Sequence, residues 1–321
     1  MKVAIFVGSD LPYIFHSFLD KFLDDDVYII STKKTKKSIP IQYHWIECKK
    51  QFFSKIYEVK SSLKEVGIEK LVVYNSFFPK LQSSDKLIER VAYIDEVGFL
   101  NQPKLYSFFE KRRLLKKIKN QITFSNQIIV PTQTVKDIIL KHFKCNSDIN
   151  IEFSYYGKNS SGALNQSIAL PDRFILHESH LSKKDNIFNL IQAIENLDIV
   201  LVLLGPENSY LKKVLRYTRK KKFSDRIIHL KNVNTTDYSL IYQKCEWIVD
   251  PSFLNYSGYL LAKAYQYQKP IILSNNVGFH EVSIDFPVFI ETGQKIDLCA
   301  KNSFLWNNES ERNRRVDFIK S

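Results

Sequence analysis

The segment Ile199-Val-Leu-Val-Leu-Leu-Gly-Pro206 decides the fold class of this 321-residue chain. Six consecutive apolar residues that end at a Gly-Pro pair are typical of a strand buried on both faces, as in a parallel sheet. A segment with helical periodicity, 208–222, comes next, and a second short apolar run, 227–230, follows it. A strand, a helix and another strand in this order predict a right-handed crossover unit of an α/β fold.

The same alternation continues toward both ends of the chain. Strands are expected at 2–8, 27–31, 70–75, 91–94, 127–130, 151–155, 173–177, 198–204, 227–230, 247–250, 271–274 and 288–290. Helices are expected at 12–24, 51–66, 82–89, 104–122, 132–143, 186–196, 208–222, 236–244, 258–267 and 308–320. This is about twice the number of units in one doubly wound sheet, so the pattern predicts two sheets.

A polar segment, 158–171, carries Gly162 and Pro171, lacks periodicity and is the predicted linker. We therefore expect a first Rossmann-like domain over 1–165, a second over 166–305 and a last helix, 306–321, that returns toward the first domain. Two such domains bind ligands beyond the carboxyl ends of their strands, which predicts a site in a cleft between them.

Composition excludes several classes of protein. Hydrophobic residues make up 44% and charged residues 25%, as in globular proteins, and no apolar run approaches the roughly 18 residues of a membrane-spanning helix. Residues 1–8 are expected to form a strand rather than a signal peptide. Four widely spaced cysteines (Cys48, Cys145, Cys245 and Cys299) disfavour a disulfide framework or a zinc site and favour a soluble protein of a reducing compartment. The first β–α turn lacks a GxGxxG motif, which disfavours a dinucleotide site.

The net charge of +13 lies mainly in the first half of the chain. Residues 1–170 hold 26 basic and 17 acidic residues, and the remainder holds 21 and 17. This excess favours an anionic partner. The densest basic run, 111–119, is interleaved with apolar residues at helical spacing: Leu114, Leu115, Ile118 and Ile122. The run is compatible with a surface helix packed on its own core or with docking of residues 108–122 on a membrane surface. No aromatic interleaving or known module supports nucleic-acid binding.

From Arg173 to about Val282 the chain resembles the C-terminal donor domain of family 4 glycosyltransferases, which are retaining enzymes of the GT-B fold. The motifs that carry the resemblance are Phe174-Ile-Leu-His-Glu-Ser-His-Leu-Ser-Lys-Lys-Asp-Asn186, Val202-Leu-Leu-Gly-Pro206, 232–242, Trp247-Ile-Val-Asp-Pro-Ser252, Asn255-Tyr-Ser-Gly-Tyr259 and 269–278 with Glu281. A thinner likeness covers 128–136 and 155–159. The resemblance implies an α/β protein of GT-B type, with two doubly wound Rossmann-like domains facing across a cleft.

The resemblance also implies an activity: transfer of a hexose from a UDP- or GDP-linked sugar to a lipid-linked or saccharide acceptor, with no metal required. It suits the assembly of a bacterial surface polysaccharide such as capsule or lipopolysaccharide, in the cytoplasm or on the inner face of the plasma membrane. A composition rich in Lys, Ile, Phe, Tyr and Asn is typical of AT-rich bacterial genomes.

This chain departs from the family pattern at the positions that carry the chemistry. The phosphate arginine of the family falls on His180, and its lysine on Asp185, beside Lys184. Two glutamates fall on Asn255 and Lys263; the second normally holds the nucleotide ribose. An N-domain His-Asp pair falls on Ile94-Asp95, whereas Gly258 is retained next to Ser257. The resulting predictions are donor binding by His180, Lys184, Ser257, Gly258 and Lys263, catalytic roles for Asp95 and Asn255, and acceptor binding by His16 and Glu96.

Two functional hypotheses remain open at this point. The first is an active glycosyltransferase. The alternative is a non-catalytic GT-B partner or chaperone subunit that binds a glycan, a glycoprotein or an active transferase, since both donor glutamates are replaced. Each predicted site residue also has an ordinary structural interpretation as a loop residue, a cap or a surface charge. The tyrosines of 259–267 are expected to pack in the core.

Overall fold

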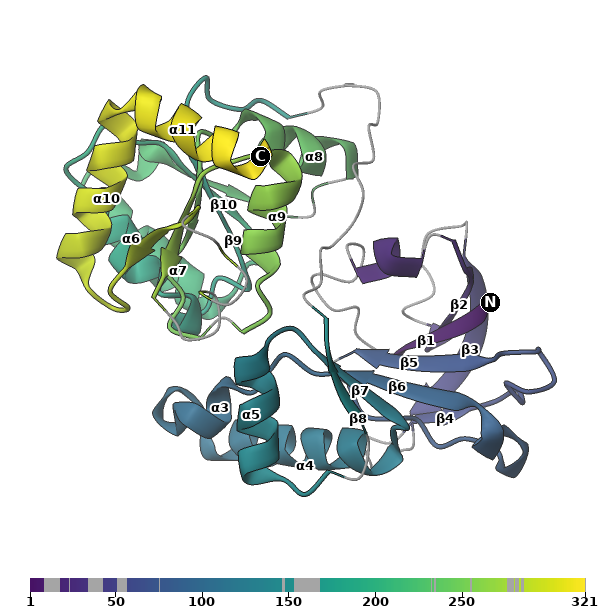
Figure 1. The fold of residues 1–321 in the computed structure, drawn as a ribbon. Helices are drawn as coiled ribbons and strands as arrows, with labels where there is room; N and C mark the ends of the chain where they lie inside the picture. The colour runs from purple at the N-terminus through teal and green to yellow at the C-terminus, as the bar shows by residue number, and fades with distance from the viewer. Residues whose placement is uncertain are drawn as a thin grey trace. The chain divides into compact units, whose positions relative to one another are not determined.

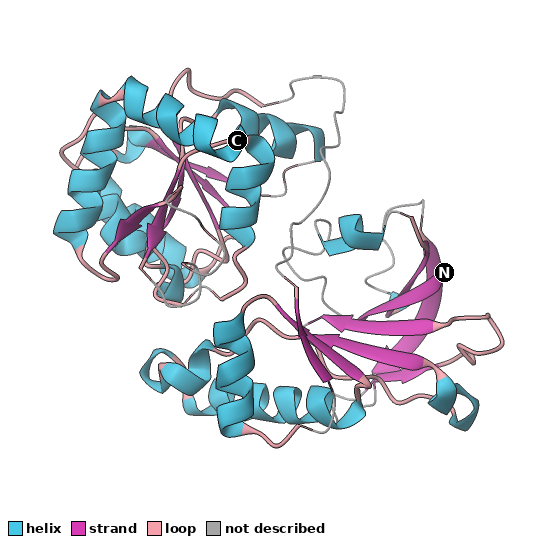
Figure 2. Cartoon of the chain, viewed as in Figure 1, coloured by secondary structure: helices cyan, strands magenta, loops and turns pink. Residues whose placement is uncertain are grey.

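The computed structural model describes residues 1–8, 18–22, 24–33, 43–50, 57–74, 76–145, 148–152, 168–231, 233, 235–254, 256–275, 280, 283 and 286–320. The chain divides into two compact units, Met1–Phe153 and Ser154–Ser321. Each unit has one sheet with helices packed against it, as Figures 1 and 2 show for the two units separately. The predicted α/β class with two doubly wound domains is confirmed. The predicted linker lies mostly outside the described residues.

The sheet of the first unit has eight strands in the order β4-β3-β2-β1-β5-β6-β7-β8. All neighbouring pairs are parallel except β3 with β4, which is antiparallel. The strands are β1 (Lys2–Gly8), β2 (Asp26–Ser31), β3 (His44–Lys50), β4 (Tyr57–Val59), β5 (Lys70–Tyr74), β6 (Glu89–Tyr93), β7 (Gln127–Val130) and β8 (Asp148–Ile151). The helices are η1 (Asp20–Phe22), η2 (Ser83–Leu87), α3 (Gly98–Asn101), η3 (Pro103–Leu105), α4 (Phe108–Phe124) and α5 (Gln133–His142).

The sheet of the second unit is wholly parallel and has the order β11-β10-β9-β12-β13-β14. Its strands are β9 (Ile175–Glu178), β10 (Leu201–Leu204), β11 (Ile227–Leu230), β12 (Ile248–Asp250), β13 (Ile271–Ser274) and β14 (Val288–Ile290). The helices are η4 (Lys183–Asp185), α6 (Ile187–Ala193), α7 (Ser209–Lys220), η5 (Ser224–Arg226), α8 (Thr235–Lys244), α9 (Tyr259–Tyr267), α10 (Lys295–Asn307) and α11 (Glu309–Lys320). Strands β9, β10, β12 and β13 are buried at every position because helices cover both faces.

Several expected elements differ from the structure. The helix predicted over 51–66 is wrong where the structure describes it, because 57–59 form β4 and 63–67 form a turn. Residues 82–89 form only the short η2 and the start of β6, so a full helix there is also wrong. Strand β3 and helix α10 were not predicted. The expected strand at 151–155 begins earlier, at Asp148.

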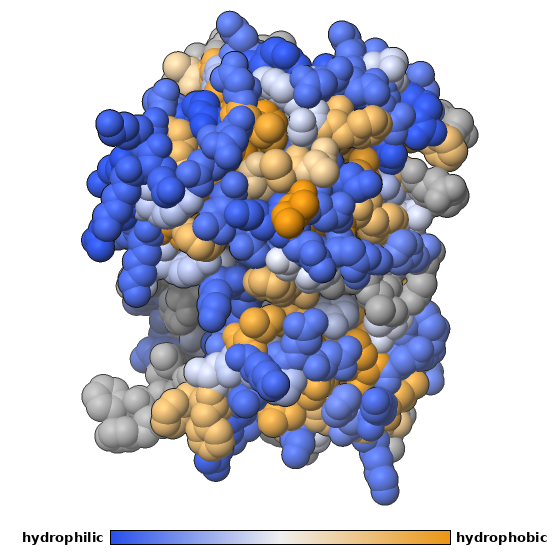
Figure 3. All heavy atoms as spheres, turned by 90° about the vertical axis from the view of Figure 1, so that its left-hand side faces the viewer, coloured by the Kyte–Doolittle hydropathy of each residue, from blue (hydrophilic) through white to orange (hydrophobic). Residues whose placement is uncertain are grey.

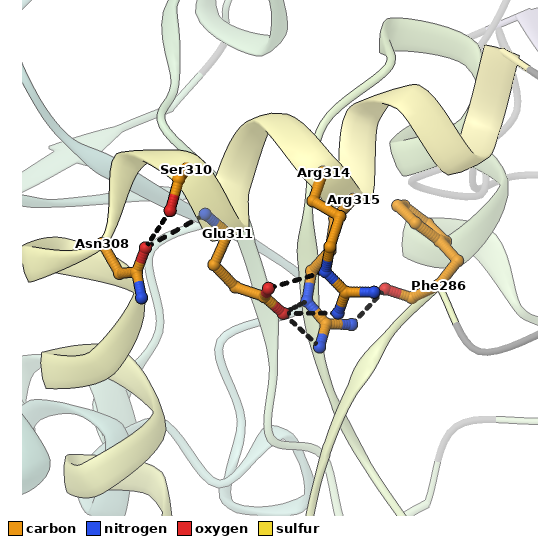
Figure 4. A network of polar contacts seen from close by, with 6 residues as sticks. All are labelled: Phe286, Asn308, Ser310, Glu311, Arg314 and Arg315. Atoms are coloured by element: carbon orange, nitrogen blue, oxygen red, sulfur yellow. Dashed lines mark hydrogen bonds and ion pairs between the residues drawn. The ribbon is translucent and has the colours of Figure 1, made fainter.

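The last helix, α11, is fixed within the second unit by the polar network of Figure 4. At its first turn, Asn308 Oδ1 accepts from the Glu311 amide at 3.1 Å. The Glu311 carboxylate then binds the guanidinium groups of Arg314 and Arg315, at 2.7 and 2.8 Å. Arg315 also donates to the Phe286 carbonyl oxygen at 2.7 Å. The expected return of this helix toward the first domain stays a prediction.

Candidate functional site

The candidate site lies at the carboxyl edge of the second sheet. In the observed strand order the direction of the crossovers reverses between β9 and β12. Loops that leave the two central strands at such a point diverge to opposite faces, and doubly wound domains hold their ligands there. Glu178 ends β9 and Asp250 ends β12. The loops that follow these two residues therefore form the candidate site.

A buried histidine fixes the turn after β9. His177 Nδ1 lies 2.7 Å from the Val249 carbonyl oxygen, and Nε2 lies 2.9 Å from Ser179 Oγ. Because a carbonyl oxygen only accepts, Nδ1 carries a proton and Nε2 accepts from the Ser179 hydroxyl. Ser179 Oγ accepts from the Leu181 amide at 2.9 Å. The turn is thus joined to β12 through a continuous hydrogen-bonded chain.

The two loops of the site are also bonded to each other. The Phe253 amide, after β12, donates to the Lys184 carbonyl oxygen at 2.9 Å. Within η4, Asp185 Oδ2 accepts from the Ser182 amide at 2.6 Å in a capping box. Asp185, which stands where the resembled family has a lysine, therefore has a local structural role. Lys184 is the half-buried cation of this loop.

The N-terminus of α9 meets the same edge of the sheet. Gly258 precedes the helix with φ of 65°, a left-handed conformation that glycine adopts without strain. Ser257 Oγ accepts from the Tyr259 amide at 3.3 Å. The first amides of a helix have no acceptor within it and carry the positive end of the helix dipole, so they favour an anion.

Glu178 is the centre of a buried polar cluster that we call the Glu178 cluster. Its carboxylate is 3% exposed. Oε2 accepts from Tyr238 at 2.7 Å and from Tyr242, and Oε1 accepts from Tyr259 at 3.3 Å. The hydroxyls of Tyr238 and Tyr259 also contact each other. A buried carboxylate needs such donors, because burial without hydrogen bonds costs several kcal/mol.

Lys263 belongs to this cluster rather than to an open surface. The residue is 2% exposed, and its Nζ donates to Gln266 Oε1 at 2.8 Å. The ammonium lies 5.7 Å from the ring centroids of Tyr238 and Tyr259 and 5.9 Å from that of Tyr267. Tyrosine rings attract a cation at these distances, so the tyrosines hold both a carboxylate and an ammonium.

Among the residues predicted for the donor, the structure gathers Lys184, Ser257, Gly258 and Lys263 around the carboxyl edge of β9 and β12. His180 lies in the same loop with an exposed side chain, and its carbonyl oxygen accepts from Asn208 at 2.8 Å. Asn255 and His16 lie outside the described residues. Whether any of these residues contacts a donor or an acceptor stays a prediction.

Sequence reasoning missed Glu178, Tyr238 and Tyr259 as members of one cluster. One signal was available: Glu178 is a charged residue at the end of a predicted strand, and such a residue is seldom buried unless it is paired. The tyrosine partners come from two helices separated along the chain, α8 and α9, so their spacing carries no such signal.

In the first unit, the two predicted carboxylates have different surroundings. Asp95 follows β6, is 9% exposed and accepts from the Tyr74 hydroxyl at 2.7 Å, at the end of the neighbouring strand β5. Glu96 is 37% exposed and pairs with Lys117 of α4 at 2.6 Å. Asp95 is thus held at the carboxyl edge of the sheet, whereas Glu96 anchors a helix.

A second group at this edge joins the largely buried Lys21 side chain to half-buried Tyr93 and exposed Glu152. Lys21 Nζ lies 2.5 Å from Glu152 Oε1 and 4.8 Å from the Tyr93 ring centroid. Burial lowers the pKa of Lys21, although the hydrogen bond to Glu152 opposes this. Burial, and then the Glu152 charge, raises the pKa of Tyr93. This ion pair ties η1 to the end of β8.

The exposed side of α4 differs from the sequence-based expectation. Leu114 and Ile118 are fully buried in the unit and cannot serve as an apolar face for a membrane. Instead, Phe108 and Phe109 are 65% and 82% exposed in the first turn. Exposed basic side chains follow them on the helix: Arg112, Arg113, Lys116 and Lys119. We call these six residues the aromatic-basic surface. Figure 3 shows that hydrophobic side chains on the face it presents form small groups among hydrophilic ones.

Two kinds of feature are absent from the described part of the chain. No group of three or more His, Cys, Asp or Glu side chains is arranged there to hold a metal ion. No helix among those residues is long and apolar enough to cross a membrane.

Comparisons with known proteins agree with this architecture. Residues 165–320 match the family model of glycosyl transferases group 1. HepE from Anabaena, solved in complex with UDP and glucose, is similar over 99% of this chain and 93% of its own, at 12% identity and a TM-score of 0.71. Comparison with curated protein sequences gives no match.

Two further solved structures show the same likeness. Sucrose-phosphate synthase from Thermosynechococcus elongatus covers 99% of this chain and 94% of its own, at 12% identity and a TM-score of 0.69. WaaG, a glycosyltransferase involved in lipopolysaccharide biosynthesis, covers the same shares at 13% identity and a TM-score of 0.68. At such identities the likeness concerns the fold, and the predicted GT-B class is confirmed.

Proposed function

We propose that this chain, a glycosyltransferase whose residues 165–320 match the family model of glycosyl transferases group 1, moves a hexose from a nucleotide sugar to a lipid-linked or saccharide acceptor. We propose UDP or GDP as the nucleotide, retention of the anomeric configuration, and a role in bacterial surface polysaccharide assembly. In the reaction, the acceptor oxygen bonds to the anomeric carbon as the bond to the diphosphate breaks. The hydroxyl proton passes to the departing phosphate oxygen.

One observation carries the donor side of this proposal. Helix α9 begins, through left-handed Gly258, at the carboxyl edge where β9 and β12 diverge. The amides that follow Tyr259 in its first turn, with the Ser257 hydroxyl and the Lys184 ammonium, are the groups to which we assign the diphosphate charge; the Tyr259 amide itself donates to Ser257 Oγ. Preorganised donors of this kind stabilise charge that develops on a leaving group, each by on the order of 3 kcal/mol. With these groups, the proposal needs no metal ion.

On the acceptor side, we propose that Asp95 orients the attacking hydroxyl. Its carboxylate is already held by the Tyr74 hydroxyl at the carboxyl edge of the first sheet. A carboxylate fixed in this way is preorganised to accept a hydrogen bond from a sugar hydroxyl. His16, Glu96 and Asn255 remain proposed members of the site.

The first experiment measures donor binding by isothermal titration with UDP, GDP and their hexose conjugates, with and without EDTA. We expect binding at up to millimolar ligand in both conditions. Gly258→Ala should weaken it about tenfold, because a Cβ strains the left-handed residue that aims the first amides of α9. Gly67→Ala is the matched control, since Gly67 has φ of 80° in the first unit with only a lysine side chain nearby. Absence of binding to every nucleotide would refute the proposal.

We further propose that the aromatic-basic surface of α4 docks on an anionic membrane at the inner face of the plasma membrane. Aromatic rings can enter the headgroup region, and each well-placed basic side chain adds about 1 kcal/mol near anionic lipids. Sedimentation with vesicles of phosphatidylglycerol and phosphatidylcholine tests this. We expect Phe108→Ser/Phe109→Ser to reduce binding at least fivefold, while Phe304→Ser, an exposed phenylalanine of α10, does not. Equal binding by both variants would contradict the assignment.

A second candidate function, a non-catalytic GT-B subunit, is favoured by the burial of Lys263 within the Glu178 cluster. In that case the purified protein would show no donor hydrolysis or transfer and would co-purify with a second transferase. Hydrolysis of a nucleotide sugar that disappears in Asp95→Asn would exclude it.

A further inference from the structure

We propose that an exposed row of basic side chains on α7 binds an acidic glycan, namely the saccharide chain that the enzyme extends. This inference rests on the proposed function and names the class of its saccharide acceptor: a linear glycan that carries an acidic group in its repeat. The row, which we call the α7 basic row, consists of Lys212, Lys213, Arg216, Arg219 and Lys220.

The α7 basic row lies on one side of its helix. Its members occupy three successive turns, and at about 100° per residue they fall within about 120° of the helix circumference. They extend over about 12 Å along the helix axis. The other side of the helix is fixed to the unit by Leu211, Val214 and Thr218, which are buried. All five basic side chains are exposed, so the row faces away from the core.

Most of this charge is not neutralised within the described part of the chain. Lys212 pairs with Glu207 at 3.4 Å, whereas no acidic side chain among the described residues forms an ion pair with the other four members. Helix α7 itself contains no acidic residue. Like charges on neighbouring turns of a helix repel one another, and an anionic partner relieves this repulsion.

The surroundings of the row indicate which kind of polyanion fits. Every exposed side chain of α7 is polar or charged, and Tyr210 and Tyr217 are half-buried against the core. A membrane-surface helix needs apolar side chains that enter the headgroup region. Single-stranded nucleic acid is held by stacking on aromatic rings, and a protein interface has an apolar centre. An acidic glycan needs none of these features, because its charges lie along a hydrophilic chain.

The row begins beside the candidate site. Asn208, the N-cap of α7, accepts from the Leu211 amide at 2.9 Å. Its Nδ2 donates to the carbonyl oxygens of His180 and Leu181, at 2.8 and 3.1 Å. The first turn of α7 is thus bonded to the loop after β9, which is one of the two loops of the site.

The direction of α7 suits a chain that grows in the site. Because β10 and β11 are parallel, α7 runs from the carboxyl edge of the sheet back to the opposite edge. A glycan whose growing end lies in the site can therefore place its earlier repeats along the row. A single exposed ion pair contributes little to binding, so the row should act through several contacts at once and distinguish a chain from a single sugar.

The test measures the binding of fluorescein-labelled oligogalacturonates by fluorescence anisotropy at low ionic strength, without nucleotide. We expect an oligomer that spans the row to bind at least about tenfold more tightly than galacturonate or a neutral dextran oligomer of the same length, because several ion pairs act together. Lys213→Glu/Arg216→Glu/Lys220→Glu should abolish this difference. Added salt should weaken binding by the unmodified protein.

The matched control, Lys64→Glu/Lys104→Glu/Lys144→Glu, reverses three exposed lysines of the first unit and changes the net charge equally. It should keep the preference for the acidic oligomer, and circular dichroism checks that all variants are folded. Equal losses in the two variants, or no preference for the acidic oligomer, would overturn the inference alone. Tighter binding of anionic vesicles or of single-stranded DNA through the same row would also overturn it. Failure to bind any nucleotide would instead overturn the proposed function.

Discussion

The variant Gly205→Ala tests whether the turn after β9 is as tightly constrained as its contacts indicate. Gly205 follows β10 with φ of 151°, and a Cβ there would lie 2.0 Å from the Ser179 carbonyl oxygen. The conformation itself costs an alanine about 1–3 kcal/mol, and a backbone atom that must move adds about 1–3 kcal/mol, as in overpacked cores. We expect the second unit to lose about 2–6 kcal/mol of unfolding free energy, the sum of these two contributions.

The control variant is Gly293→Ala in the same unit. Gly293 has φ of 84°, but its nearest neighbour is the Phe253 ring at 3.1 Å, a side chain that can rotate away. We expect Gly293→Ala to lower the free energy of unfolding by about 1–2 kcal/mol. Urea unfolding followed by tryptophan fluorescence in a Trp45→Phe background reports on the second unit, which contains Trp247 and Trp306. Equal losses in the two variants would refute the argument from backbone contact.

Three further predictions concern ionisable groups. The guanidinium groups of α11 lower the pKa of Glu311 to about 2. Glu311→Gln should therefore lower the free energy of unfolding at pH 7 by about 1–2 kcal/mol, which is less than the pKa shift alone implies because solvent screens the ion pairs. Since this pKa is depressed, ionised Glu311 stabilises the fold above about pH 4.5, and this stabilisation is lost as the pH falls toward 2. Urea unfolding midpoints of the unmodified protein and the variant, measured between pH 2 and 5, test this. Burial raises the pKa of Cys48 and Cys245 to about 12, so both thiols should resist a disulfide reagent at pH 8 until urea is added. Finally, Lys117→Met should remove the ion pair with Glu96 and destabilise α4, so that the amides of this helix exchange hydrogen faster. Unchanged exchange would show that this ion pair does not stabilise the helix.

The elements that the sequence predicted well are those whose burial is uniform. Strand β10 is apolar along its whole length and β13 is apolar up to Ser274, because both faces of the sheet are covered. Strand β3 was missed because it has no continuous apolar run, and its buried apolar residues are Ile46 and Cys48. Helix α10 was missed because only Leu298, Asn302 and Leu305 are buried and the N-cap, Gln294, makes no side-chain cap hydrogen bond. Helix α10 is therefore weakly amphipathic and lacks an N-terminal capping signal, so its sequence pattern does not identify it.

The candidate site could likewise be predicted only in part from the sequence. Its loops could be located because they follow strand ends, and Gly258 could be identified because a strand-to-helix turn favours glycine. The surroundings of Lys263 could not be predicted, since they depend on tyrosines of α8 and α9 meeting the end of β9. Such a contact between three elements leaves no periodic trace in the sequence. The exposed rings of Phe108 and Phe109 were likewise hidden, because helical spacing does not state which face is buried.

The Glu178 cluster changes how the replaced donor residues should be interpreted. Taken singly, a lysine in place of a ribose-binding carboxylate removes an acceptor and adds a buried charge, and an unpaired buried charge is strongly destabilising. In the structure, however, Lys263 shares Tyr238 and Tyr259 with a carboxylate at the end of β9. The tyrosine hydroxyls donate to the carboxylate, and the ammonium lies 5.7 Å from the centroids of the same two rings. Because Lys263 and Glu178 contact the same two tyrosines, the burial of the lysine and the burial of the glutamate depend on the same side chains.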